Sequence, residues 1–123
     1  MIYRRNVLIV DDQAPVSRAI ARRLALRVEG TTITTSLGFR AARVLLGQSR
    51  YDLIISDYNT NDRESGPEFL QWAGEKYSDI GRMIMSDSSH SLDESPNFDG
   101  KFNKNNINGL VEAVEEYFVA KGY

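Results

Sequence analysis

Short apolar runs recur along this chain, and each is followed at once by an acidic or hydroxyl-bearing residue. The runs and their polar ends are Val7–Val10 with Asp11 and Asp12, Leu53–Ile55 with Ser56 and Asp57, and Met83–Met85 with Ser86. Continuous apolar runs of this length are typical of strands that are buried on both faces. A sheet built from such strands needs other elements to cover both of its faces. This pattern constrains the fold more than any other feature of the sequence.

The segment after the first apolar run has the spacing of an amphipathic helix. From Pro15 onward, Val16, Ile20 and Leu24 recur at helical intervals and form one apolar stripe. Gly30 follows, and we expect it to end the helix because glycine accepts the backbone conformations found after helix ends.

Three more helices are expected farther along the chain. One covers Phe39–Leu46 and is closed by Gly47, because glycine commonly ends helices. Gly66 and Pro67 open the next helix, since proline fits the first helical turn. The last helix carries apolar residues at helical spacing: Ile107, Leu110, Val111, Val114 and Phe118.

Two other segments complete the set of predicted strands. Thr31–Ser36 is rich in β-branched residues, and Gly100–Asn103 precedes a lysine. Between the fourth and fifth strands, the segment 87–99 is rich in serine and aspartate and contains Pro96. We expect this segment to be a loop or at most one short turn of helix. A fourth helix at this point of the pattern is therefore expected to be short or missing.

Five strands separated by helices predict an α/β fold. Parallel neighbours need crossover connections, and these are right-handed, so the expected architecture is a doubly wound, five-stranded parallel sheet. The 123 residues are the length of one ordinary domain, and we expect residues 1–123 to form a single domain. Ligands of such sheets bind outside the carboxyl ends of the strands, which makes the residues just after each strand the informative ones.

Composition excludes several classes of function. The chain has no cysteine and one histidine, which rules out disulfides, thiolate metal sites and polyhistidine zinc sites. The net charge of −2 gives no bulk attraction to nucleic acid, and no apolar run approaches membrane-spanning length. We expect a cytoplasmic protein that binds neither nucleic acid nor membrane. Four arginines gather in the first predicted helix, where a solvated face is a better interpretation than a docking face for an acidic partner: Arg18, Arg22, Arg23 and Arg27.

Polar residues at the predicted strand ends form a candidate site. Asp11 and Asp12 follow the first strand, Asp57 the third, Ser86 the fourth and Lys104 the fifth. Three carboxylates that close together would raise one another's pKa values, and a bound cation relieves this repulsion. Magnesium fits best, because it prefers hard oxygen ligands and keeps several waters.

With a metal in place, Asp57 could act as a nucleophile toward a phosphoryl group. The Lys104 ammonium and the Ser86 hydroxyl could then bind the oxygens of that group. Each residue alone is weak evidence, because aspartate and serine commonly cap helices and form turns, and lysine is common on surfaces. The signal lies in the four positions together.

This order of residues resembles the bacterial response-regulator receiver family. The resemblance covers nearly the whole chain, from Val7–Asp12 through Tyr51–Asp57 to the last helix. It implies a flavodoxin-like receiver fold with strand order 2-1-3-4-5, here without an output domain. It also implies a signalling module rather than an enzyme, one that acts in a two-component phosphorelay through protein–protein interaction.

The resemblance assigns a role to each site residue. Asp57 is implied as the phosphoacceptor, while Asp11 and Asp12 hold Mg²⁺ directly or through water. Asn59 would lend its backbone carbonyl to the metal. Ser86 and Lys104 would bind the phosphoryl group. The implied phosphate donor is a sensor histidine kinase or a histidine phosphotransfer protein, and the downstream partner is an unidentified protein.

Four features depart from the family pattern. The loop that runs from Tyr58 to Gly66 is one residue longer than usual and lacks the usual Met-Pro pair. Asp87 stands where a small residue normally follows the hydroxyl residue, and Lys101 stands where a switch aromatic is normal. We expect the neighbouring Phe102 to point to the opposite face of the sheet from Lys101, because strand side chains alternate. Finally, Asn105 replaces a proline, and the helix before the fifth strand is short or absent.

Two alternatives stay open on the sequence. A degenerate receiver would keep the fold and serve as a docking module independent of phosphorylation, and the four departures favour this hypothesis. A phosphatase with an aspartyl-phosphate intermediate is disfavoured, because the usual hydrolase pattern places its nucleophile after the first strand with a second aspartate two residues on. Here that stretch is Asp11-Asp12-Gln13, and Asn59 rather than an acid follows Asp57.

Overall fold

The computed structural model describes residues 4–60, 63–87 and 98–122. Helices and strands alternate along the chain as far as the fourth strand. The elements in chain order are β1 (Arg5–Val10), α1 (Ala14–Arg27), β2 (Thr31–Ser36), α2 (Phe39–Gln48), β3 (Leu53–Asp57), α3 (Gly66–Lys76), β4 (Gly81–Ser86), β5 (Gly100–Asn103) and α4 (Ile107–Ala120).

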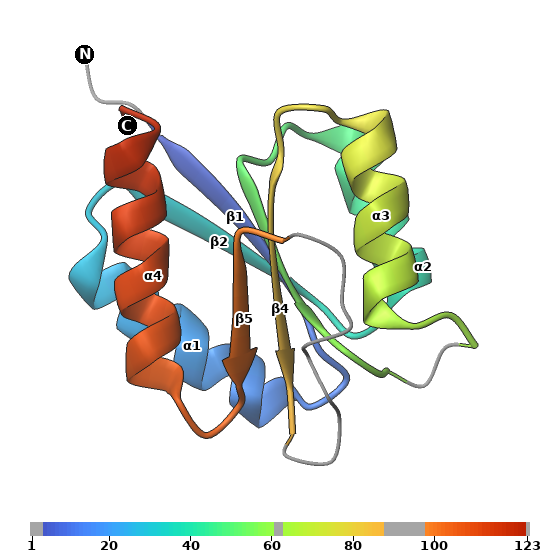
Figure 1. Ribbon diagram of the computed structural model, residues 1–123, viewed down its shortest axis with the longest axis horizontal. Coiled ribbons are helices and arrows are strands. Elements are labelled where there is room, and N and C mark those ends of the chain that lie inside the picture. The colour runs from blue at the N-terminus through green and yellow to red at the C-terminus, as the bar shows by residue number, and fades with distance from the viewer. Residues whose placement is uncertain (1–3, 61–62, 88–97, 123) are drawn as a thin grey trace.

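The five strands form one sheet in the order β2-β1-β3-β4-β5, and all neighbours are parallel. Figure 1 shows α1 and α4 on one side of the sheet and α2 and α3 on the other. The predicted doubly wound sheet and its strand order 2-1-3-4-5 are therefore confirmed. All carboxyl ends of the strands lie along one edge, where the candidate site residues follow them.

Two apolar clusters fill the space between the sheet and its helices. In β1, Val7 and Ile9 face the side of α1 and α4, while Leu8 and Val10 face the side of α2 and α3. This alternation buries β1 on both faces, as its continuous apolar sequence predicts. The α1/α4 cluster includes Ile20, Leu24, Leu110, Val111, Val114 and Phe118. The α2/α3 cluster includes Phe39, Ala42, Leu46, Phe69, Leu70 and Ala73.

The predicted start of α3 is confirmed, and the predicted end of α2 at Gly47 is wrong. Ser65 caps α3 through a capping box with Glu68, and Pro67 lies in its first turn. Gly47 does not close α2, since the helix continues to Gln48 and the Ser49 N–H donates to the Leu45 carbonyl. Gly47 has no positive φ, so its backbone stays compatible with the helix.

The segment between β4 and β5 bears on the predicted short or missing helix. Residues 88–97 lie outside the described residues, and so does most of the predicted loop 87–99. Between Ser86 and Gly100, the described residues contribute no helix. None of the helices in the described part of the chain combines the length and hydrophobicity that crossing a lipid bilayer requires.

Candidate functional site

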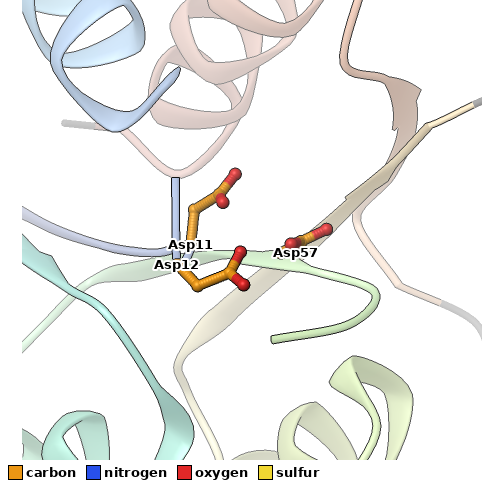
Figure 2. A group of neighbouring side chains, drawn as sticks. All are labelled: Asp11, Asp12 and Asp57. Atoms are coloured by element: carbon orange, nitrogen blue, oxygen red, sulfur yellow. The ribbon is translucent and has the colours of Figure 1, made fainter. Parts of the chain in front are cut away.

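Three aspartates meet at the carboxyl edge of the sheet. Asp11 and Asp12 lie in the turn between β1 and α1, and Asp57 is the last residue of β3. Each offers a carboxylate oxygen, and these oxygens all lie within 4.8 Å of one another. Figure 2 shows the three side chains gathered around one space above the strand ends. The neighbouring strands β1 and β3 are responsible, because they pair in parallel and end side by side.

Lys104 joins two of these carboxylates. It follows β5, and its Nζ atom lies 3.0 Å from Oδ2 of Asp11 and 3.0 Å from Oδ2 of Asp57. The backbone N–H of Lys104 donates to the Ser86 carbonyl, which anchors the lysine to the end of β4. Asp11 is fully buried, and the side chains of Asp57 and Lys104 are only 7% and 14% exposed. The charges therefore meet in a poorly solvated environment, where they act strongly on one another.

Burial is the main influence on the two carboxylates. It raises the pKa of Asp57, with help from the charge of Asp11, to about 6, although the hydrogen bond from Lys104 opposes this rise. Burial also raises the pKa of Asp11, against the backbone hydrogen bond from Gln13 and the charge of Lys104. Because both pKa values are raised, an additional cation would stabilise the ionised forms of these two carboxylates.

Burial and the two carboxylate neighbours of Lys104 act on its pKa in opposite directions. Burial lowers its pKa, but its hydrogen bonds to Asp11 and Asp57 and their negative charges outweigh that effect and raise the pKa overall. Lys104 is therefore positively charged in the site at neutral pH. Oδ2 of Asp11 is buried and lies 3.0 Å from the Lys104 ammonium, and because a carboxylate oxygen has two lone pairs it can also accept from a second group.

Asn59 approaches the site through its backbone. Its backbone N–H donates to the Asp57 carboxylate, which favours the ionised form of that group. Asn59 also forms an isolated antiparallel bridge with Ser65, so the loop after β3 folds back on itself just before α3. The use of its carbonyl as a metal ligand stays a prediction.

A cavity of about 170 Å³ opens beside these groups. The described residues that line it come from the ends of β1, β3, β4 and β5: Asp12, Gln13, Asp57, Asn59, Thr60, Asp87 and Lys104. Its volume equals that of several waters at about 30 Å³ each, enough for a partly hydrated cation or a phosphoryl group. Gln13 and Thr60 were not predicted, and no pattern in the sequence distinguishes them from ordinary loop residues.

Ser86 lies near the site but is not among the described residues that line the cavity. It is 1% exposed, and its hydroxyl donates to the Asp87 carbonyl at 2.9 Å. Asp87 lines the cavity instead. The structure therefore brings together Asp11, Asp12, Asp57 and Lys104, and it leaves the Ser86 hydroxyl engaged with the backbone.

The loop after Asp57 is attached at both of its described ends. The Gly66 N–H donates to the Tyr58 carbonyl at 2.6 Å, and a side chain at Gly66 would overlap the carbonyl oxygen of Asp57. Glu64 forms an ion pair with Arg43 of α2 at 2.6 Å. Residues 61 and 62, part of the longer loop noted in the sequence, lie outside the described residues.

The remaining departures lie on β5 and just after it. Phe102 packs against the α1/α4 cluster, on the face opposite to that of Lys101, as strand alternation predicts. Asn105 donates its backbone N–H to Oδ1 of Asn103, and Asn106 caps α4 through Gly109. A short polar turn thus connects Lys104 to α4 where the family pattern has proline.

A larger cavity of about 510 Å³ lies at the amino ends of the strands, between the C-terminal ends of α2 and α3. Arg50 and Lys76 line it alongside Asp52 and Asp79. It contains no gathering of three carboxylates among the described residues. The smaller cavity beside Asp57 is therefore the better candidate for chemistry.

Comparison with known proteins adds evidence on the fold. No protein-family model and no curated protein matches the chain. The Francisella response regulator 1452 receiver domain is 18% identical, with a TM-score of 0.77 over 95% of this chain and 98% of that one. The response regulator TrrA from Thermotoga maritima, solved in complex with Mg²⁺-BeF, is 24% identical, with a TM-score of 0.76 over 91% and 97%.

A third structure extends the similarity. The N-terminal domain of a response regulator/sensory box/GGDEF 3-domain protein from Carboxydothermus hydrogenoformans is 21% identical, with a TM-score of 0.77 over 97% of this chain and all of that domain. These likenesses span nearly the whole chain at low sequence identity. The chain therefore has the flavodoxin-like fold of response-regulator receiver domains.

Proposed function

We propose that this chain is a phosphorylation-dependent signalling switch that accepts a phosphoryl group on Asp57 and signals by binding a protein partner. The observation that carries this proposal is the position of Lys104 at 3.0 Å from both Asp11 and Asp57, beside a cavity that Asp12 also lines. A nucleophilic carboxylate, two further carboxylates and one ammonium are the parts that phosphoryl transfer to an aspartate requires.

The residues present suit a magnesium ion. Asp11, Asp12 and Asp57 offer closely spaced carboxylate oxygens, and the buried Asp11 Oδ2 has a second lone pair besides the one that faces Lys104. The carbonyl of Asn59 would complete the protein ligands. The ion would neutralise negative charge on the oxygens of the incoming phosphoryl group. The fold neighbour from Thermotoga maritima was solved with Mg²⁺-BeF, which supports the choice of ion.

The proposed step is a transfer between two proteins. An oxygen of the ionised Asp57 carboxylate attacks phosphorus of a phosphohistidine, an O–P bond forms, and the N–P bond of the donor breaks. The bonding electrons return to the imidazole nitrogen, and because the other ring nitrogen carries a proton, the donor histidine leaves in its neutral form. Lys104 then stabilises the charge of the phosphoryl oxygens. The donor is a sensor histidine kinase or a histidine phosphotransfer protein.

Phosphotransfer from such a donor tests the proposal. Incubation with purified phosphohistidine donors and Mg²⁺ should add one phosphoryl group, seen by intact-protein mass spectrometry. Asp57→Asn should abolish the addition, and Asp12→Asn should slow it. Asp99→Asn is a matched control, since Asp99 lies at the amino ends of the strands, away from the site, where it accepts from the backbone N–H of Arg82. Phosphorylation of Asp57→Asn at the wild-type rate would refute the assignment.

The degenerate docking module is the second candidate, and one observation favours it. Asp87 lines the cavity while the Ser86 hydroxyl donates to the backbone, so an acidic residue stands beside the cavity and the hydroxyl donor expected there is engaged elsewhere. Asp87→Ala separates the two functions. Faster phosphorylation of this variant would show that the wild-type site works against repulsion, whereas absent phosphorylation in both proteins would favour docking.

A further inference from the structure

β2 is an edge strand whose outer side lacks the usual protection against pairing. It stands at one end of the sheet and, in the described part of the chain, pairs only with β1. Its six residues, Thr-Thr-Ile-Thr-Thr-Ser, contain no charge, no glycine and no proline. Exposed edges in folded proteins usually carry a charge, a proline or a bulge, or are very short.

The opposite edge strand has the protective features that β2 lacks. β5 is only four residues long, begins with Gly100 and carries Lys101. Lysine and short length both discourage strand addition. The two edges of one sheet therefore differ, and β2 is the edge that remains suited to accept another strand.

The hydrogen-bonding pattern shows which groups of β2 face outward. The carbonyls of Gly30 and Ser36 accept from Arg5 and Asp11, so these even-numbered residues point their backbone groups toward β1. Alternation along a strand then directs the N–H and C=O groups of the odd-numbered residues to the open edge. These residues are Thr31, Ile33 and Thr35.

The five residues from Thr31 to Thr35 read the same in both directions about Ile33. An antiparallel pairing of two copies centred there places Ile33 opposite itself, Thr31 opposite Thr35, and Thr32 opposite Thr34. Since Thr31, Ile33 and Thr35 all face outward, each of their pairs can exchange two hydrogen bonds. Threonine pairs directly across strands are favourable, so the edge is complementary to itself.

We propose that β2 is a self-association edge, through which two copies of this chain pair antiparallel about Ile33 and form a continuous ten-stranded sheet. Such a contact is isologous and closed by a two-fold axis. Ile33 already packs against the α1/α4 cluster, and pairing would extend that apolar contact to the second copy. The exposed Leu37 directly after the strand adds apolar surface beside the same edge.

A contact through one short strand is small, so the dimer should be weak, with a dissociation constant on the order of 100 µM. Sedimentation velocity of the full-length chain over a range of concentrations should show a monomer–dimer equilibrium. In the same samples, amide exchange at Thr31, Ile33 and Thr35 should slow as concentration rises. A chain that stays monomeric to about 1 mM would overturn the proposal.

Two double variants test the pairing and its register. Thr32→Lys with Thr34→Lys places like charges directly opposite each other in both symmetric pairs and should weaken dimerisation about tenfold. Thr32→Glu with Thr34→Lys places opposite charges across the same pairs and should restore dimerisation to within about threefold of wild type. Both variants should fold, because Thr32 is exposed and the backbone groups of both positions point to β1. Circular dichroism checks this.

The outcomes separate this edge from other interfaces. Weakening in the lysine pair with recovery in the glutamate–lysine pair would establish the proposed register. Equal dimerisation of all three proteins would show that another surface associates, and it would overturn the proposal. Dimers in which the amides of Thr31, Ile33 and Thr35 exchange at their monomer rates would do the same.

Discussion

Lys104 lies 3.0 Å from Asp57, and the same ammonium lies 3.0 Å from Asp11. One cation thus compensates two carboxylates, of which one is fully buried and the other 7% exposed. The fold explains the arrangement, because β1, β3 and β5 all end at the same edge of a parallel sheet. With both carboxylates ionised, Asp11, Asp57 and Lys104 together carry one negative charge, and an ionised Asp12 adds a second.

Removal of the lysine should therefore destabilise the metal-free protein. Lys104→Met leaves Asp11 and Asp57 without their cation, and we expect the free energy of unfolding at pH 8 to fall by about 3 kcal/mol. Added Mg²⁺ should restore part of this loss. Lys101→Met, which makes the same change of charge on β5, is the control and should cost less than about 1 kcal/mol. Urea titrations of both variants give the comparison, and equal losses would contradict the central role of Lys104.

The raised pKa of Asp57 predicts a pH-dependent stability. Because its pKa is about 6 in the folded chain against 3.8 as the ordinary value, the folded state binds this proton more tightly than the unfolded state. The stabilisation from this proton is present below pH 3.8 and is lost as the pH rises through about 6. Without metal, Asp57→Asn should raise the free energy of unfolding by about 1–2 kcal/mol at pH 8.

The same variant should show no such gain at about pH 4, where Asp57 is already mostly protonated. Urea unfolding in metal-free buffer across this pH range measures the difference between variant and wild type. A gain that does not change with pH would show that Asp57 is not the group responsible.

Gly66 is predicted to be essential for the shape of the site. A Cβ atom there would overlap the Asp57 carbonyl oxygen and lie 2.9 Å from Tyr58 Cα. Gly66→Ala should therefore displace the loop after Asp57, lower the free energy of unfolding by about 2 kcal/mol and weaken Mg²⁺ binding. Gly47→Ala is the control, because a Cβ atom there meets no atom within 4 Å.

The control should stabilise the chain by about 0.5–1 kcal/mol, since Gly47 lies within α2 and alanine favours helix. Thermal unfolding and calorimetric Mg²⁺ titration measure both effects. Unchanged Mg²⁺ affinity in Gly66→Ala would contradict the proposed link between this glycine and the site.

Arg43 should connect the loop after Asp57 to the α2/α3 side of the molecule. Its guanidinium lies 4.6 Å from the Trp72 ring centroid, and it pairs with Glu64 of the loop at 2.6 Å. A double-mutant cycle with Arg43→Gln and Glu64→Gln should give a coupling energy of about 0.5 kcal/mol, because both side chains are partly exposed.

Arg43→Gln alone should cost about 1 kcal/mol more than Glu64→Gln alone, since it also removes the cation–π contact. The fluorescence of Trp72, the one tryptophan in the chain, should shift more in Arg43→Gln than in Glu64→Gln. A coupling energy near zero would show that the loop does not depend on this ion pair.

The strands and the gathering of carboxylates were predictable because both follow from local patterns. Continuous apolar runs such as Val7–Val10 identify buried strands, and parallel topology then directs Asp11, Asp57 and Lys104 to one edge. Strand alternation likewise predicts the opposite faces of Lys101 and Phe102. No knowledge of side-chain packing is needed for these inferences.

Other features depend on contacts between distant segments, which no local pattern contains. The end of α2 was predicted wrongly, because glycine permits a helix end without requiring one and Gly47 remains helical. Whether the Ser86 hydroxyl faces the cavity depends on a rotamer and on the neighbouring Asp87 carbonyl. The Arg43–Glu64 pair joins α2 to a loop twenty-one residues away and has no signature in the sequence.

The most direct test of the account is a titration with Mg²⁺ and beryllofluoride, a stable mimic of an aspartyl phosphate, followed by backbone amide NMR. We predict saturable shifts at Asp57, Asn59 and Lys104 that require both Mg²⁺ and beryllofluoride and that are absent in Asp57→Asn. The amide signals at the amino ends of the strands, such as that of Asp52, should stay unchanged. No shift in a folded wild-type chain, or the same shifts in Asp57→Asn, would contradict the assignment of Asp57 as the phosphoacceptor.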